Sequence, residues 1–417
     1  MRFTFIHAAD LHLGSPLAAL GLRDAEVGAR FAAAGRAAVK ALVDEAINSQ
    51  AAFLIIAGDV FDGDWRDVAT GLFMVSQLSR LSREGIPVYL VKGNHDADSV
   101  VSYNLAWPSG TSVFGFRKAE TFLLESHNVA LHGRSYKDRE PEAGFAASYP
   151  APKPGWLNIG ILHTALDGAR GDHAAYAPCT IPHLQGFGYD YWALGHIHQP
   201  QIVSQDPWMV YPGNIQGRSV RETGARGAMR VSVEDGRIAS VVPIVLDAAR
   251  WAHERVDVSG CADEGELVRA VEAAMAAVHR AAEARPVAVR LTLHGTHPLH
   301  ARLTARHEEY HADLRQRGTH LAEDFWLEKL VLETRSPAVR TALAEADGLD
   351  VAALLDASLL EPEMAKAAGE DIAALAGKLP REMKDEWLKD ETLPARILAQ
   401  ARDLLAARLE TEGAGAP

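Results

Sequence analysis

Residues 1–245 alternate short apolar runs with longer segments whose apolar residues recur at helical spacing. The runs Phe3–Ala8, Phe53–Ala57 and Val88–Val91 are typical of buried strands. The segments Ala25–Asn48 and Asp67–Arg83 between them have the periodicity of helices with one buried face. Such alternation of strands and helices predicts a layered α/β fold.

Short β-type runs predominate after this first part, which predicts a second sheet. We expect these strands at Val129–Gly133, Leu157–Leu162, Tyr191–Leu194, Gln201–Ser204, Met209–Tyr211, Ala228–Val233 and Ile238–Val245. The stretch Tyr136–Gly155 is rich in proline, glycine and charge, so we expect a surface loop there. The two parts together predict one domain over 1–245, a sandwich of two sheets flanked by helices.

The pattern changes near Leu246 and again near Ser336. Residues 246–335 carry a β-α-β-α-β pattern that predicts a small separate α+β domain. The expected elements there are Trp251–Val258, Asp263–Ala284, Val287–Leu293, His297–Arg317 and Phe325–Thr334. Residues 336–417 form a helical region interrupted by prolines, and its last helix, Pro394–Leu409, carries a leucine-rich face. This face suits packing on its own protein or docking of a partner.

Charge and cysteine content narrow the setting. The 417 residues carry a formal net charge of −13, which is not the basic footprint of a stand-alone nucleic-acid binder. From Ser336 onward 9 Lys and Arg stand against 16 Asp and Glu, a balance of −7, so this region is not expected to grip DNA. Two distant cysteines and the short apolar run Ala51–Ala57 indicate a cytoplasmic protein without a membrane span.

Polar residues with metal-binding chemistry follow five of the expected strands. They are Asp10-Leu11-His12, Gly58-Asp59, Gly93-Asn94-His95-Asp96, His163 and Gly195-His196-Ile197-His198. Residues i and i+2 of an extended chain share a face, so each D-x-H or H-x-H pair converges on one point. Ligands of open α/β folds bind at the carboxyl ends of strands. Five such clusters in this order predict one shared metal site.

The residue types indicate which cations suit that site. Carboxylate, amide and imidazole groups without a thiolate favour Mn²⁺ or Fe²⁺ over Ca²⁺, while Zn²⁺ stays open.

The set of D-x-H, GD, GNHD, H and GHxH motifs resembles the calcineurin-type metallophosphoesterase superfamily. Within it, Ala9–Gly14, Gly58–Asp62 and Tyr211-Pro212-Gly213-Asn214 resemble the DNA-repair nuclease branch, which contains SbcD and YhaO-like proteins. The resemblance covers residues 10 to about 220 and is more specific for the superfamily than for the branch. In that branch a small α+β cap domain follows the nuclease domain, which is the role expected for 246–335.

The resemblance implies two divalent metal ions, most simply Mn²⁺, and a role for each motif residue. One ion would be held by Asp10, His12 and His198, and the other by Asn94, His163 and His196. Asp59 would bridge them. His95 would be catalytic rather than a ligand, either protonating the leaving oxygen or stabilising the transition state. Asp62 and Asp96 would orient imidazoles or backbone.

Two further groups of residues leave alternatives open. Arg218 and Arg221 follow the Tyr-Pro-Gly-Asn turn, and they either bind substrate phosphates or are ordinary surface arginines. Histidines at helical spacing form a second group, which we interpret as a solvated helix face rather than a metal site. These are His297, His300, His307 and His311.

The leading functional hypothesis is a DNA exo- or endonuclease subunit. The resemblance implies an SMC-like ATPase partner of the SbcC or YhaN type and a homodimer. A phosphomonoesterase or small-nucleotide phosphodiesterase is the alternative, but phosphatases of this superfamily carry an arginine soon after the GD aspartate. Here Arg66 comes late after Asp59, which favours a diester. A scaffold with a decayed site is a third hypothesis, and the filled ligand positions argue against it.

Overall fold

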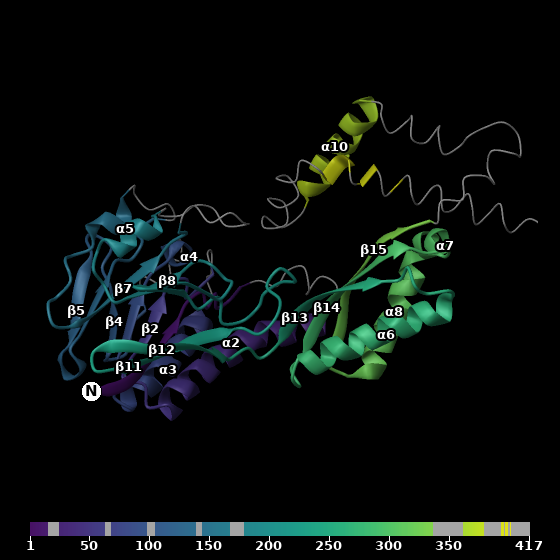
Figure 1. Ribbon diagram of the computed structural model, residues 1–417. Helices are drawn as coiled ribbons and strands as arrows, with labels where there is room; N and C mark the ends of the chain where they lie inside the picture. The colour runs from purple at the N-terminus through teal and green to yellow at the C-terminus, as the bar shows by residue number, and fades with distance from the viewer. Residues whose placement is uncertain are drawn as a thin grey trace, which may run out of the picture. The chain divides into compact units, whose positions relative to one another are not determined.

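The computed structural model describes residues 1–15, 25–62, 68–97, 105–138, 144–166, 179–336, 362–378, 393–395, 397, 398 and 401. The chain forms two compact units, one ending at Trp251 and the other beginning at Ala252 (Figure 1). Most of the predicted helix Pro394–Leu409 lies outside the described residues, while helix α10 (Pro362–Ala376) is described. The predicted division into 1–245, 246–335 and 336–417 stays a prediction.

The first unit contains a six-stranded sheet with a parallel centre. The strand order is β12 (Arg237–Val245), β11 (Gly227–Glu234), β1 (Arg2–Ala8), β2 (Leu54–Ala57), β3 (Val88–Val91), β4 (Thr111–Val113). Strands β1 to β4 pair in parallel, and β11 runs antiparallel to β1 and β12. The parallel strands therefore end at one common edge.

A second six-stranded sheet also has a parallel centre. Its order is β5 (Glu120–Leu124), β6 (Val129–Gly133), β7 (Leu157–His163), β8 (Tyr191–Gly195), β10 (Trp208–Tyr211), β9 (Gln201–Gln205). Strands β6, β7, β8 and β10 pair in parallel, with β5 and β9 antiparallel at the edges. The short 3-10 helix η2 (Phe145–Ser148) interrupts the predicted loop 136–155.

Alternating side chains assign the faces of these sheets. Phe5, Ile55 and Tyr191 belong to one apolar core to which both sheets contribute. The intervening residues, such as Ile6 and Ile56, pack instead with helices α2 (Ala25–Asn48) and α3 (Val68–Arg83). Period-two alternation thus separates a core between the sheets from a core beneath the helices. The predicted sandwich of two sheets flanked by helices is confirmed.

The second unit contains a three-stranded sheet in the order β13 (Arg250–Asp257), β14 (Val287–Thr296), β15 (Phe325–Arg335). Asp263 caps the N-terminus of helix α6 (Glu264–Ala281), because its side chain accepts a hydrogen bond from Glu266 N. The apolar face of this helix packs on the sheet.

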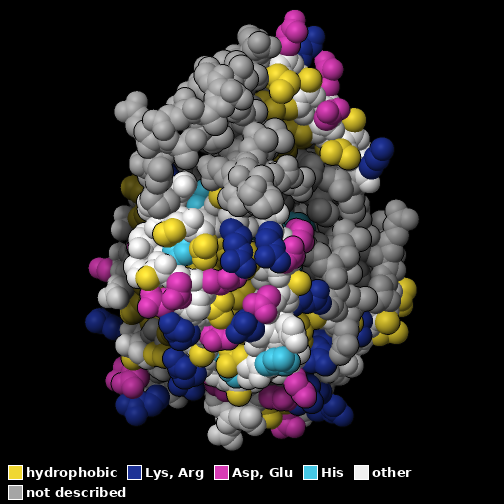
Figure 2. All heavy atoms as spheres, turned by 90° about the vertical axis from the view of Figure 1, so that its right-hand side faces the viewer, with side chains coloured by type: hydrophobic (Ala, Val, Ile, Leu, Met, Phe, Trp, Pro, Cys, Tyr) yellow, Lys and Arg dark blue, Asp and Glu magenta, His cyan; other side chains and the backbone are white. Residues whose placement is uncertain are grey.

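Figure 2 shows basic and acidic side chains interspersed on the face of the molecule that this view presents. No helix among the described residues is long and apolar enough to cross a membrane.

Three details of the sequence interpretation need correction. The single helix expected over His297–Arg317 is two helices, α7 (His300–Ala305) and α8 (His307–Leu321), because Arg306 between them leaves helical geometry with φ −115°. His297 precedes both helices and is fully buried, so it is not part of a solvated helix face. Strands β4 and β5 were not predicted, because their half-exposed side chains lack a strong apolar signal.

Candidate metal centre

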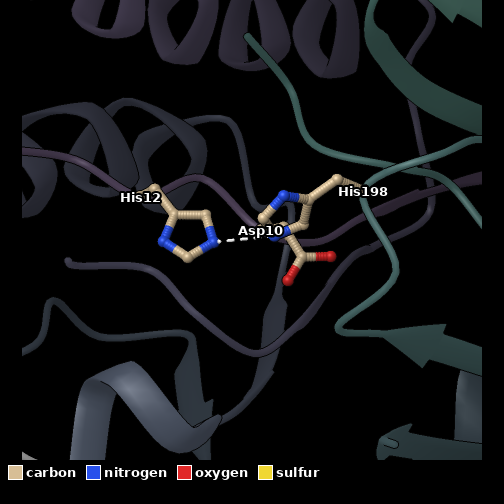
Figure 3. Close-up of side chains that lie close together, drawn as sticks. All are labelled: Asp10, His12 and His198. Atoms are coloured by element: carbon tan, nitrogen blue, oxygen red, sulfur yellow. Dashed lines mark hydrogen bonds between the residues drawn. The ribbon is translucent and has the colours of Figure 1, made fainter. Parts of the chain in front are cut away.

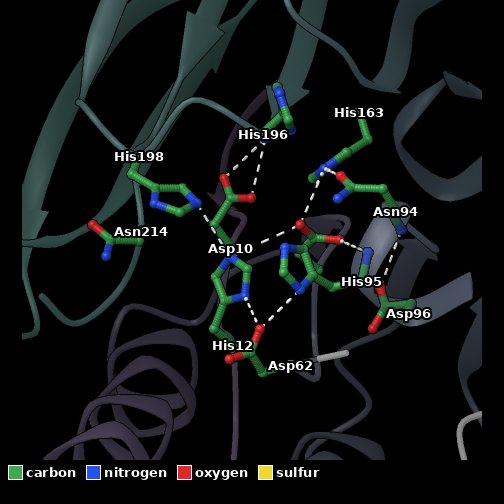
Figure 4. A network of polar contacts seen from close by, with 12 residues as sticks. Asp10, His12, Asp62, Asn94, His95, Asp96, His163, His196, His198 and Asn214 are labelled. Carbon is green, nitrogen blue, oxygen red and sulfur yellow. Dashed lines mark hydrogen bonds and ion pairs between the residues drawn. The ribbon is translucent and has the colours of Figure 1, made fainter. Parts of the chain in front are cut away.

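The five polar clusters follow parallel strands of both sheets, and the structure gathers them at one place (Figure 4). Asp10 and His12 follow β1, Asp59 follows β2, and Asn94 opens the short helix α4 (Asn94–Ala97) after β3. From the second sheet, His163 ends β7, while His196 and His198 follow β8. The loops are tied together by backbone bonds, because Asp10 N donates to Gly58 O and His12 N to Asp59 O, each at 3.0 Å.

Asp10, His12 and His198 form the first group of converging donor atoms (Figure 3). All three are buried, and their ligand atoms lie within 4.8 Å of one another. The Nε2 atoms of His12 and His198 face each other at 3.1 Å. We call this group position A.

Asp10, Asp59 and His163 form a second group of converging donor atoms. His163 Nε2 lies 3.3 Å from Asp59 Oδ2 and 3.0 Å from Asn94 Oδ1. The ring of His196 lies beside that of His163, with centroids 5.2 Å apart. Asp59 Oδ2 is also 3.8 Å from His12 Nε2, so this carboxylate stands between the two groups. We call the group of Asn94, His163 and His196 position B.

The outer nitrogens of His163 and His198 have acceptor partners, while that of His12 lies near a carboxylate oxygen without hydrogen-bond geometry. His163 Nδ1 lies 2.9 Å from Ala57 O, and His198 Nδ1 lies 2.7 Å from Glu222 Oε1. His12 Nδ1 lies 3.3 Å from Asp62 Oδ1. An acceptor at Nδ1 places the proton there and leaves the Nε2 lone pair pointing inward.

Lone pairs that face one another indicate which group the donor atoms fit. With protons on Nδ1, His12 and His198 point two lone pairs at each other. This contact is repulsive until a cation stands between the two atoms. The residues therefore fit divalent metal ions, with imidazole, carboxylate and amide donors.

Burial shifts the pKa values of the same groups. It raises the pKa of Asp10 to about 7, and it lowers those of His12 and His198 to about 4 and 3. Burial opposes a charge on His163 too, but the adjacent Asp59 carboxylate raises the pKa of this ring to about 9. In the metal-free protein, the proton of His163 beside Asp59 takes the place of the cation that these donor atoms would bind.

Backbone strain is concentrated at this centre. Asp10, His12, Asp59 and His196 all have positive φ, at 51°, 42°, 53° and 94°. Residues with a Cβ adopt this region rarely and at a cost of about 1–3 kcal/mol each. Four such residues at one site indicate that the surrounding structure imposes these angles in order to aim the side chains.

Glycines in the motifs permit this close approach. A Cβ on Gly93 would overlap the Asp59 carboxylate, and one on Gly195 would overlap Ala57 O. These glycines precede Asn94 and His196, so each lets a ligand-bearing loop lie directly against the neighbouring β2 exit. The G in the GNHD and GHxH motifs is therefore a packing requirement.

His95 stands at the edge of the centre with about 30% of its side chain exposed. Its Nδ1 lies 2.8 Å from Asp62 Oδ1, the atom that also faces His12. Burial opposes a charge on His95, but the contact with Asp62 raises the pKa of the ring. Asp96 contacts backbone instead, because its carboxylate accepts from Val60 N, Phe61 N and Gly93 N at 3.0–3.1 Å.

The two predicted substrate arginines differ in position. Arg218 is partly buried, with NH2 3.3 Å from Glu222 Oε1 and NH1 3.8 Å from Asp62 Oδ1. Arg221 is exposed on the same turn. A groove of about 420 Å³ opens beside His12 and Arg218 and extends along α2 to Arg36.

Glu222 and Asn214 belong to the site but were not assigned to it from the sequence. Glu222 contacts His198, and Asn214 Nδ2 donates to Glu222 Oε2 at 2.8 Å. The only available signal was the position of Glu222 four residues after Arg218. A lone glutamate in a polar turn carries no such information without the fold.

Comparisons with known proteins agree with this geometry. The calcineurin-like phosphoesterase family matches residues 3–200, and the middle domain of the metallophosphoesterase YhaO matches residues 251–335. The chain is 36% identical over 299 residues to the uncharacterized metallophosphoesterase YhaO of Bacillus subtilis, covering 71% of this chain and 72% of that protein. The chain belongs to the YhaO-like branch of the calcineurin-like phosphoesterases.

More distant relatives include two archaeal proteins named DNA double-strand break repair protein Mre11. The one from Methanopyrus kandleri is 27% identical over 64% of this chain and 61% of its own length. The one from Archaeoglobus fulgidus is 29% identical over 52% and 51%. A dimetal phosphatase from Danio rerio, known from its crystal structure, is 13% identical over 59% of this chain and 99% of that chain, with a TM-score of 0.37. The match to the phosphoesterase family and the two groups of converging donor atoms together indicate the residues of a dinuclear divalent metal site.

Proposed function

We propose that the protein is a two-metal phosphodiesterase that cleaves DNA, acting as the nuclease subunit of a cytoplasmic DNA-repair complex. The observation that carries this proposal is the convergence of donor atoms in two groups, Asp10 with His12 and His198, and Asp10 with Asp59 and His163, next to an open groove. The names of the two archaeal relatives favour DNA over other phosphodiesters.

The proposed ligand assignment is the one that the family resemblance implies. Asp10, His12 and His198 would hold one ion at position A. Asn94, His163 and His196 would hold the other at position B, and Asp59 would bridge the two. When bound, two divalent ions clamp phosphate oxygens and lower the pKa of the attacking water. Mn²⁺ suits this donor set, with Fe²⁺ and Zn²⁺ as the competing candidates.

His95 would act on the leaving group. The Asp62 carboxylate at Nδ1 orients the ring and stabilises its protonated form, so that Nε2–H can donate to the departing oxygen. Asp62 also faces His12, so one carboxylate aligns a metal ligand with the proton donor. Asp96 would hold the two loops in register through the amides of Val60 and Gly93.

The groove supports a substrate larger than a single phosphate. Its described lining contains Arg36, Arg218 and the apolar Phe31, and no carboxylate. Two guanidinium groups along this groove suit phosphates that flank the scissile bond. Arg221, on the same turn, would contact the backbone further from the centre.

Digestion of end-labelled linear and closed-circular DNA with Mn²⁺ or Mg²⁺ tests this proposal, beside p-nitrophenyl phosphate as a monoester. We expect metal-dependent cleavage of DNA and little release of p-nitrophenol. Hydrolysis of the monoester alone would replace this proposal with a phosphomonoesterase. The ratio of linear to circular cleavage separates exonuclease from endonuclease activity.

We also propose that residues 336–417 dock an SMC-like ATPase of the SbcC or YhaN type, and that the protein acts as a homodimer. The −7 balance of this region opposes direct contact with DNA. Truncation after Thr334 should leave cleavage of short DNA intact and abolish co-purification with the ATPase. A truncated protein that aggregates would instead assign the leucine face of Pro394–Leu409 to its own core. Light scattering of the full chain tests the dimer.

A further inference from the structure

The carboxylate of Glu222 lies behind the ring of His198, on the side away from the metal centre. Oε1 lies 2.7 Å from His198 Nδ1 and accepts from Arg218 NH2 at 3.3 Å. Oε2 accepts from Asn214 Nδ2 at 2.8 Å and from the backbone N of Arg218 at 2.7 Å. About 12% of the side chain is exposed. These neighbours present donors to both oxygens.

This arrangement decides which nitrogen of His198 carries the proton. Arg218 NH2 also lies 3.3 Å from His198 Nδ1, but a guanidinium can only donate. The closer and oppositely charged Glu222 therefore sets the tautomer, with the proton on Nδ1. The Nε2 lone pair is then held toward His12 and Asp10 before any ion binds.

The histidines of position A differ from His163 of position B in what stands behind the ring. At position A, a carboxylate oxygen lies 2.7 Å from the outer nitrogen of His198 and 3.3 Å from that of His12. At position B, the outer nitrogen of His163 meets the neutral carbonyl of Ala57. A carboxylate behind an imidazole raises its basicity as a ligand more than a carbonyl does.

We propose that Glu222 is a positioning residue for the metal ion at position A and makes this position the tighter of the two. The inference rests on the metal centre described under the proposed function. It adds a residue outside the ligand motifs and an order of occupation, with position A filled first.

Glu222→Gln is the direct test, because an amide cannot replace this carboxylate. With the oxygen of the glutamine amide toward His198, the amide NH2 group would face two donors, Asn214 Nδ2 and Arg218 N. With the amide flipped, the NH2 group would face the Nδ1–H of His198 instead. Titration of the metal-free full chain with Mn²⁺ should show two ions. The affinity of the tighter one should fall about 10–100-fold in the variant, with the weaker one unchanged. Glu125→Gln, at an exposed glutamate, is the matched control.

A double-mutant cycle separates positioning from support of the loop. In a His198→Ala background, Glu222→Gln should have no further effect on Mn²⁺ affinity, because the ring that it orients is gone. An equal loss in both backgrounds would overturn the inference and leave Glu222 a purely structural role. Circular dichroism of the metal-free variants confirms that they fold.

Two outcomes distinguish this inference from the proposal on which it rests. A wild-type protein that binds no Mn²⁺ contradicts the metal centre itself. A wild type that binds two ions, with unchanged affinities in Glu222→Gln, contradicts only the role of Glu222. Should the variant not fold, ¹⁵N-histidine spectra of metal-free wild type decide the question, with the His198 signals assigned from His198→Ala. A ring protonated on Nε2 would overturn the inference.

Discussion

The two units of this protein use buried polar groups in opposite ways. In the first unit, carboxylates and imidazoles that follow parallel strands are almost fully buried, among them Asp10, Asp59 and His163. In the second unit, strands β14 and β15 are also parallel, yet among the described residues only His297 and Tyr310 are both ionisable and buried. Its charges are paired at the surface, as in Arg290–Glu328 and Arg317–Asp313.

This difference indicates that the polar site costs the first unit folding free energy. Burying an unpaired charge is strongly unfavourable, and strained φ angles at four site residues add to the cost. The described part of the second unit has no buried carboxylates, and its core of residues such as Leu291 and Phe325 is apolar. Its positive-φ residues Glu283 and Ala284 lie in a turn instead of a polar site. Parallel strands alone therefore do not create a catalytic site. Divalent ions bound at this cluster would offset its charge in the first unit.

The largest expected effect comes from Asp59→Ala in the first unit. This residue stands between positions A and B, so its loss should disturb both ions and reduce DNA cleavage to the background rate. Metal analysis and the cleavage assay measure the two effects. Asp257→Ala, in the second unit, is the control and should change neither. Full activity of Asp59→Ala would disprove the two-metal assignment.

His95→Ala should lower turnover by ~10²–10⁴-fold, the usual contribution of a general acid or base. Metal content should stay near that of the wild type, because His95 is placed outside positions A and B. Single-turnover kinetics with parallel metal analysis test both statements. If one ion is lost together with activity, His95 is a ligand and its assigned role is wrong.

Leu291→Ala probes the apolar core of the second unit. A fully buried leucine in such a core contributes about 2–5 kcal/mol to the free energy of unfolding. Urea denaturation should show this loss in the second unit, with metal content unchanged. An equal loss in the first unit would mean that the two units unfold as one.

Removal of metal should act on the first unit alone. Ions present at a hundredfold excess over their dissociation constant stabilise a folded domain by ~2.7 kcal/mol per site. Chelation should therefore lower the unfolding midpoint of the first unit and leave that of the second unchanged, as hydrogen exchange resolved by unit can measure. No change in either would contradict the idea that ions offset the buried charge.

Arg290→Gln should have the smallest effect. Its guanidinium makes two contacts with Glu328, at 2.9 and 3.0 Å, but it is about 30% exposed. Partly exposed pairs contribute about 0.2–1 kcal/mol, and salt screens them. A larger loss in urea denaturation, or one insensitive to salt, would show that this pair is more than a surface contact.

The sequence by itself determined most of the strands, the polar residues at their carboxyl ends and the types of donor atom found there. Apolar runs and i, i+2 pairs are local patterns, so the exits after β1, β2 and β3 could be recognised from short stretches of chain. The family followed from the order of these motifs. The edge strands β4 and β5 could not be predicted, because half-exposed strands have only a weak pattern of apolar residues.

Only the tertiary structure decided how these residues meet. His12 and His198 are 186 residues apart in the chain, and His163 and Asn94 are 69 apart, so no local pattern could pair their atoms. The same holds for Glu222 behind His198 and for the left-handed φ of Asp10 and Asp59. Both depend on how the carboxyl ends of strands from the two sheets pack against each other, and that packing is a property of the whole first unit.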